Sequence, residues 1–81
     1  PRPTLFPYTT LFLSEFTPEY LEPALDSIRH LAHLGRVEFN YSVGETMRLK
    51  LDSWVNADEM LNTLESLPDR TVFGDVYARF V

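Results

Sequence analysis

Two stretches of the chain place apolar residues every three to four positions, which is the period of an amphipathic helix. The first stretch lies between Phe16 and Gly35, and the second lies between Val55 and Leu67. The apolar stripe of the first comprises Leu21, Leu25, Ile28, Leu31 and Ala32, and that of the second comprises Met60, Leu61, Leu64 and Leu67. We therefore predict two helices, each with one face packed against a core.

The ends of the first stretch carry residues that begin and end helices. Thr17 is suited to cap the helix, with Pro18 at its first position. Pro23 fits poorly inside a helix, so we expect either one turn before the main helix or a kink at this residue. Gly35 predicts the end of the helix.

The second helix has a clearer start signal. Asn56 and Glu59 have the spacing of a capping box, in which the Asn56 side chain accepts a bond from the third residue and Glu59 bonds back. Val55 and Met60 are spaced to pack on one another across the cap. Pro68 predicts that the helix ends before it.

Strict alternation of apolar and polar residues predicts two strands between the helices. In "RVEFNYSV", Val37, Phe39, Tyr41 and Val43 share one face, and Glu38, Asn40 and Ser42 share the other. "TMRLKLDSW" repeats the pattern. A loop over 44–46 would keep both apolar sets on one face of a hairpin, with Val43 opposite Met47, Tyr41 opposite Leu49 and Phe39 opposite Leu51.

The last strand is predicted within "TVFGDVYARFV", with Gly74 as a bulge or bend. The order is then helix, strand, strand, helix, strand. A leading strand over Tyr8–Phe16, placed centrally, would complete an α+β, ferredoxin-like β-α-β-β-α-β sandwich, with a four-stranded antiparallel sheet and two helices on one face. We expect one small domain over residues 15–81.

Charge and composition narrow the function. The chain has 81 residues, a net charge of -5 and no cysteine. A chain this acidic is repelled by phosphate backbones and anionic lipid, so we expect a basic protein partner, with no nucleic acid and no membrane. No apolar run approaches the roughly 20 residues that a membrane span needs. The lack of cysteine fits a cytoplasmic location.

Candidate catalytic and metal-binding residues are few. His30 and His33 lie three apart with Asp26 nearby, but a metal site needs three or four ligands and Arg29 lies beside them. We read both histidines as solvated, and we predict no catalytic residue, metal or cofactor. The strand face with Glu38, Asn40, Ser42, Arg48, Lys50 and Asp52 lacks the stacking rings that bind RNA. With Tyr77 and Arg79 of the last strand added to this face, the acidic total of the chain still weighs against RNA binding. Trp54 is read as a core or seam residue.

Carboxylates collect on the predicted helices. The six are Glu19, Glu22 and Asp26 on the first helix and Asp58, Glu59 and Glu65 on the second. Negative charge in the first turn of a helix is favourable in itself, so the pairs Glu19/Glu22 and Asp58/Glu59 need no acid–base role. We identify them as the candidate surface for docking a partner.

Residues 1–14 resemble the translation of a short-read sequencing-library adapter. That translation reads PRSTLFPYTTLFRS in this frame and differs from the chain only at Pro3 and Leu13. The resemblance implies that the segment is adapter-derived, although it can still form the first strand because its residues have high strand propensity. We therefore expect residues 15–81 to be part of a longer protein, and we use no side chain before Glu15 as evidence of function.

A second resemblance covers residues 16–67. Phe16 and Pro18, Pro23, Leu31, Leu34 and Gly35, then Trp54 and Asp58, are similar to positions in the ferredoxin-like segment that docks regulators in chemotaxis-type histidine kinases. The chain needs an insertion between Pro23 and Gly35 relative to that pattern. The resemblance implies a non-catalytic module that recruits a response regulator near the phosphodonor of a kinase, and it carries over no binding residue.

Two alternatives stay open from the sequence. A small-molecule sensing domain of the amino-acid-binding type has the same element order, but it would have glycine at the first strand–helix turn, where this chain has "EFTPEY". An acidic immunity or inhibitor protein that neutralises a basic toxin also fits the charge.

Overall fold

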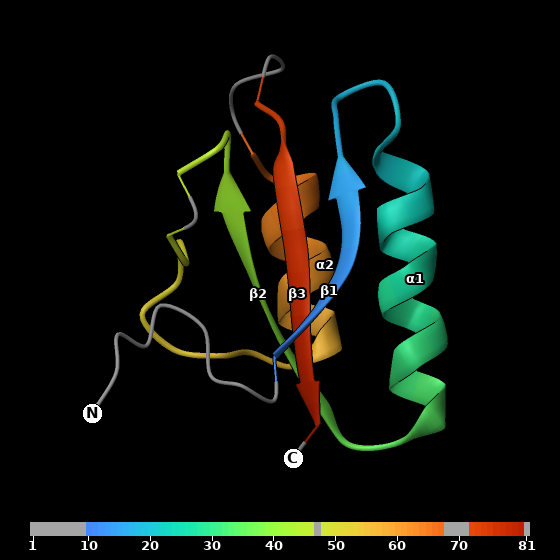
Figure 1. The fold of residues 1–81 in the computed structure, drawn as a ribbon. Helices are drawn as coiled ribbons and strands as arrows, with labels where there is room; N and C mark the ends of the chain where they lie inside the picture. The colour runs from blue at the N-terminus through green and yellow to red at the C-terminus, as the bar shows by residue number, and fades with distance from the viewer. Residues whose placement is uncertain (1–9, 47, 68–71, 81) are drawn as a thin grey trace, which may run out of the picture.

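Five elements make up the computed structural model, which describes residues 10–46, 48–67 and 72–80. In chain order they are β1 (Thr10–Phe16), α1 (Leu21–Leu34), β2 (Val37–Val43), α2 (Ala57–Glu65) and β3 (Gly74–Phe80). The strands form one antiparallel sheet in the order β1-β3-β2. The helices pack against one face of this sheet, and β3 runs through its centre (Figure 1).

The predicted α+β class is confirmed, but the four strands and the ferredoxin-like order are wrong. β3 pairs along its whole length with β2, from Val37 opposite Phe80 to Val43 opposite Gly74. β1 pairs with the other edge of β3, with a register shift between Phe12 and Ser14. The leading strand is therefore an edge strand rather than a central one. It is present from Thr10, and Tyr8 and Thr9 lie outside the described residues.

The strand predicted in "TMRLKLDSW" is replaced, as a partner of β2, by hydrogen bonds from the Asn40 side chain. The Asn40 amide donates to Leu51 O at 3.0 Å, and its Oδ1 accepts from Leu51 N at 3.0 Å and from Tyr41 N at 2.8 Å. Phe39 pairs with Val55, four residues beyond the predicted partner Leu51. Because the Asn40 amide satisfies groups that a ladder would pair, residues 50–53 bend. The predicted pair of Val43 with Met47 lies outside the described residues.

The first helix begins later than its sequence signals indicate. Thr17 caps a short turn instead, because its Oγ1 and its carbonyl oxygen both accept from Tyr20 N at 3.1 Å. α1 then starts at Leu21 and ends before Gly35. Pro23 is its third residue, where a backbone N–H has no partner within the helix, so the proline removes no hydrogen bond.

The second helix begins as predicted. Asn56 Oδ1 accepts from Glu59 N at 2.9 Å, which confirms Asn56 as the cap. Among the bonds of the described residues, the Glu59 carboxylate makes no return bond to Asn56. α2 ends at Glu65, and Pro68 lies outside the described residues.

The core lies between the helices and the sheet. Its buried members from the helices are Ala24, Leu25, Ile28, Met60 and Leu64, and those from the strands are Phe16, Val37, Phe39, Tyr41, Val76 and Ala78. Ala32, predicted to face the core, is exposed, and Ala24 is buried in its place. On the polar face of β2, Asn40 and Ser42 are both buried at 1% exposed, whereas the Glu38 side chain is 34% exposed.

Candidate docking surface

The helix layer, by which we mean α1 and α2, carries the predicted acidic surface. The six carboxylates of this surface, Glu19, Glu22, Asp26, Asp58, Glu59 and Glu65, are all exposed. Within the two helices, all of whose residues are described, Arg29 is the only lysine or arginine. The helix layer therefore presents a negative face on the side opposite the open face of the sheet (Figure 1).

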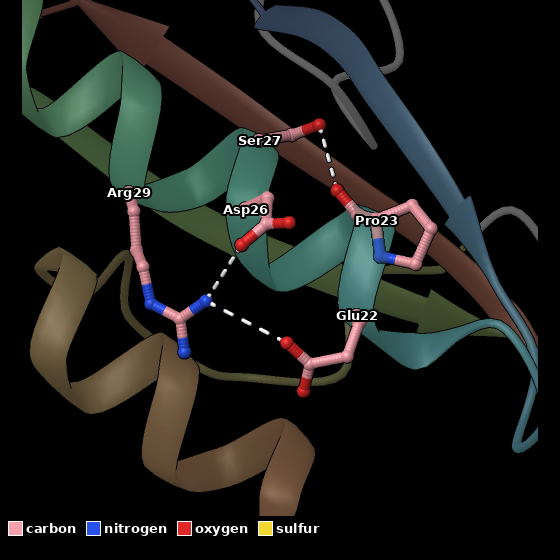
Figure 2. A network of polar contacts seen from close by, with 5 residues as sticks. All are labelled: Glu22, Pro23, Asp26, Ser27 and Arg29. Atoms are coloured by element: carbon pink, nitrogen blue, oxygen red, sulfur yellow. Dashed lines mark hydrogen bonds and ion pairs between the residues drawn. The ribbon is translucent and has the colours of Figure 1, made fainter.

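Arg29 lies between two of these carboxylates on successive turns of α1 (Figure 2). Its Nη1 is 2.8 Å from Asp26 Oδ1 and 3.8 Å from Glu22 Oε1. The carboxylates remain 72% and 74% exposed. Pairs this exposed contribute only about 0–1 kcal/mol to stability, so this network leaves Glu22 and Asp26 open to a partner.

The six carboxylates form two groups rather than one. α1 and α2 run in opposite directions, because the Leu21 end of α1 lies beside Glu65 and its Gly35 end lies beside Asp58. Glu65 therefore belongs with the carboxylates at the start of α1. Asp58 and Glu59 lie at the other end, in the first turn of α2, where the helix dipole stabilises negative charge.

The two histidines belong to no metal-ligand group among the described residues. His30 and His33 are exposed on α1. In residues 10–46, 48–67 and 72–80, no group of three His, Cys, Asp or Glu side chains could hold a metal ion. The prediction that the chain uses no metal and no cofactor stays a prediction.

A second polar cluster, which the sequence reasoning did not assemble, lies on the open face of the sheet. Arg79 donates from Nε and Nη2 to Glu38 Oε1 at 3.0 and 2.8 Å, and its guanidinium lies 4.7 Å from the centre of the Trp54 ring. Ser42 Oγ lies 3.4 Å from the Tyr77 hydroxyl. Trp54 is thus a half-buried seam residue, as predicted. Because this cluster needs β3 beside β2, the predicted strand order could not reveal it.

Cavities lie at both ends of the helix layer. A space of about 420 Å³ between the end of α1 and the start of α2 is lined by Ala32, Gly35, Arg36, Val37, Glu38, Asn56, Ala57 and Asp58. A space of about 230 Å³ lies at the β1–α1 turn, lined by Glu15, Phe16, Thr17, Tyr20 and Pro23. The first combines one arginine with two carboxylates, so its charge favours neither an anion nor a cation.

Comparisons with known proteins leave the acidic surface as the main functional clue. No family model matches the chain, and no match is found among curated proteins or solved structures. Over the described part of the chain, neither helix is long and apolar enough to cross a membrane.

Proposed function

We propose that this chain is a non-catalytic docking module that binds a basic surface of a protein partner through its helix layer. The observation that carries the proposal is the exposure of all six carboxylates, five of them on helices that hold a single arginine and Glu19 in the turn just before α1. Complementary charge steers the encounter of two proteins and fixes their register, more than it raises affinity. A module of this kind acts by raising the local concentration of its partner.

The spacing of the two acidic groups sets a requirement on the partner. On α2, Glu59 and Glu65 are six residues apart, which separates them by about 9 Å along the helix axis at about 1.5 Å per residue. The first turn of α2 holds Asp58 and Glu59, and its last holds Glu65 beside the start of α1. A partner that engages both groups must present two basic clusters about that far apart.

We take a response-regulator domain as the first partner to test. The resemblance of residues 16–67 to a chemotaxis-type kinase segment supports this choice. That segment is ferredoxin-like, whereas the strand order here is β1-β3-β2. The choice of partner therefore rests on the similar residues, and the docking role rests on the helix layer.

The alternative of small-molecule sensing has less support. It predicts a pocket at a dimer interface near the first strand–helix turn, where one chain contributes a space of about 230 Å³. Ligand pockets typically measure about 300–1,000 Å³. The third alternative, an immunity or inhibitor protein, shares the acidic surface and differs only in its partner.

A titration of the isotope-labelled chain, followed by NMR, tests docking against sensing. A response-regulator domain is added in one series and free amino acids in another, at two salt concentrations. We expect the regulator to shift signals of α1 and α2, with weaker binding at high salt. The double variant Glu22→Gln/Asp26→Asn should weaken binding. A matched control, Glu45→Gln/Asp52→Asn, removes the same charge from exposed residues outside the helix layer and should bind almost normally.

Three results would overturn the proposal. Shifts with amino acids alone, centred on residues 15–23, would favour sensing. Equal weakening in the two double variants would mean that net charge, rather than the helix layer, drives binding. Absence of shifts with the regulator and with a basic protein of matched size would remove the docking role altogether.

A further inference from the structure

The segment Arg48–Val55, here named the strap, joins β2 to α2 along the outer edge of β2. It contains bends in place of a strand. Three backbone bonds hold it: Lys50 N donates to Tyr41 O at 2.7 Å, Phe39 N donates to Val55 O at 2.7 Å, and Val55 N donates to Phe39 O at 3.0 Å. The strap therefore covers the edge of the sheet without becoming part of a regular ladder.

Side chains hold the strap as much as its backbone does. The Asn40 amide binds both backbone groups of Leu51 near the middle of the strap. At its far end, the Trp54 ring lies against the Arg79 guanidinium, which belongs to β3. Glu38, on β2, lies directly opposite Arg79 in the ladder, and its carboxylate accepts a hydrogen bond from that guanidinium. We call Glu38, Arg79 and Trp54 the latch.

The latch is open to solvent. The Glu38 and Arg79 side chains are each 34% exposed, so water and salt weaken their attraction. The polar residues of the strap, Arg48, Lys50, Asp52 and Ser53, are exposed. Its apolar residues that pack against the core, such as Leu51 and Val55, are only partly buried. Gly44, with φ of 63°, lies just before the strap at a turn where the chain can pivot.

We propose that the strap opens as a local unit, at a lower free energy than global unfolding, and that the latch sets how often it opens. Segments with few buried contacts and exposed backbone bonds are those that open locally in native proteins. Opening breaks both backbone bonds between Phe39 and Val55, the bond from Lys50 N to Tyr41 O, and the two bonds of the Asn40 amide to Leu51. The loss of these bonds is the cost that keeps the strap closed.

Opening has a consequence for α2. The strap ends at Val55, directly before Asn56, the cap of α2. Movement of the strap therefore loosens the start of α2, which carries Asp58 and Glu59. If the acidic surface docks a partner, as proposed above, the latch on the sheet face then controls one end of it. This link rests on the proposed function, whereas the opening of the strap does not.

Limited proteolysis with trypsin tests the opening, because Arg48 and Lys50 are cleavage sites within the strap. Cleavage at these two bonds is measured by mass spectrometry for the full chain and for Glu38→Gln. Loss of an ion pair and of an ordered cation–π contact together predict a rise of about tenfold in cleavage. Arg79→Lys keeps the charge but loses the two-nitrogen contact, and it should give a smaller rise in the same direction.

The control is Leu31→Ala, which removes a partly buried core contact on α1, away from the strap. If cleavage in the strap rises in this variant as much as in Glu38→Gln at equal global stability, the strap does not open independently and the proposal is wrong. Hydrogen exchange gives a second readout. Amides of Phe39, Lys50 and Val55 should exchange faster in Glu38→Gln while those of Val76 and Ala78 do not, and uniform acceleration would also contradict the proposal.

The effect on docking is tested separately. Glu38→Gln should weaken binding of the response-regulator domain if the latch positions Asp58 and Glu59. Faster strap cleavage with unchanged regulator binding would remove the link and leave the opening intact. Absence of regulator binding by the unmodified chain would instead count against the proposed function.

Discussion

At the scale of single residues, Gly74 lies where β3 approaches β2 most closely. A Cβ added there would lie 1.9 Å from the carbonyl oxygen of Ser42, which is a backbone atom and cannot turn away. We expect Gly74→Ala to lower the free energy of unfolding by about 3 kcal/mol, because backbone must move to relieve the overlap. Urea unfolding followed by fluorescence of Trp54, the only tryptophan, measures this change.

Gly35 provides a matched control for Gly74. A Cβ at Gly35 meets nothing within 4 Å, and its φ of 166° is extended backbone that any residue adopts. Gly35→Ala should therefore change stability by less than about 0.5 kcal/mol. Equal losses in the two variants would show that the contact with Ser42 does not cause the effect at Gly74.

The stability of the chain is predicted to fall at alkaline pH because of Tyr41. Burial raises the pKa of the Tyr41 hydroxyl above its usual value of 10.0. Below pH 10 the hydroxyl is neutral in both states and stability is unaffected. Above pH 10 the unfolded chain loses this proton first, so stability falls until the pH passes the raised pKa of the folded state.

The Tyr41→Phe variant isolates this effect from the other tyrosines. We expect the decline in stability above pH 10 to be less steep in the variant than in the unmodified chain, in urea unfolding at a series of pH values. The difference between their tyrosinate absorbance titrations should also place the Tyr41 transition above pH 10. Parallel stability curves would show that Tyr41 does not cause the decline.

At the scale of elements, α2 depends on its cap. Asn56 Oδ1 accepts from Glu59 N at 2.9 Å, and among the described residues no other side chain caps the start of this helix. Asn56→Ala should lower the free energy of unfolding by about 1 kcal/mol. Asn62→Ala, at an exposed position within α2, removes the same amide where it caps nothing and should be neutral or slightly stabilising. Urea unfolding compares them, and equal losses would exclude a capping effect.

The helices and two of the strands could be predicted because their signals are local. Asn56, Gly35 and the alternation of Val37, Phe39 and Tyr41 each act on neighbouring residues in the chain. The start of α1 was predicted too early, since Thr17 and Pro18 can begin a turn as readily as a helix. The bulge was predicted at Gly74, whereas the register shift lies between Phe12 and Ser14 in β1.

The strand order could not be predicted, because it depends on contacts between distant residues. A hairpin after β2 is the locally favoured pairing, yet β3 pairs there instead and Asn40 binds Leu51. For the same reason, exposure of the six carboxylates followed from the helical pattern, while the contacts of Glu38, Arg79 and Trp54 did not. Asn40 follows the alternation of its strand as Glu38 and Ser42 do, so its position gave no signal of an irregular edge.

At the scale of the whole molecule, charge is distributed unevenly between the two sides of the sheet. The helix layer carries the acidic surface with Arg29 alone to offset it, while Arg48, Lys50 and Arg79 lie on the strap and on the open sheet face. This polarity orients the molecule toward a basic partner before contact. The six carboxylates and Arg29 together account for the whole net charge of -5, because the acidic and basic residues in the rest of the chain balance.

The contribution of the N-terminal segment is tested by deletion. The described strand β1 begins at Thr10, and Pro7 has no N–H to donate to a ladder. Deleting residues 1–7 should therefore leave the free energy of unfolding nearly unchanged in urea unfolding followed by Trp54 fluorescence. A second deletion, of residues 1–16, also removes β1 and Phe16, which is 2% exposed in the core, and should prevent cooperative folding. A loss above about 2 kcal/mol from the shorter deletion would mean that residues 1–7 are integrated into the fold, because terminal trims seldom cost so much.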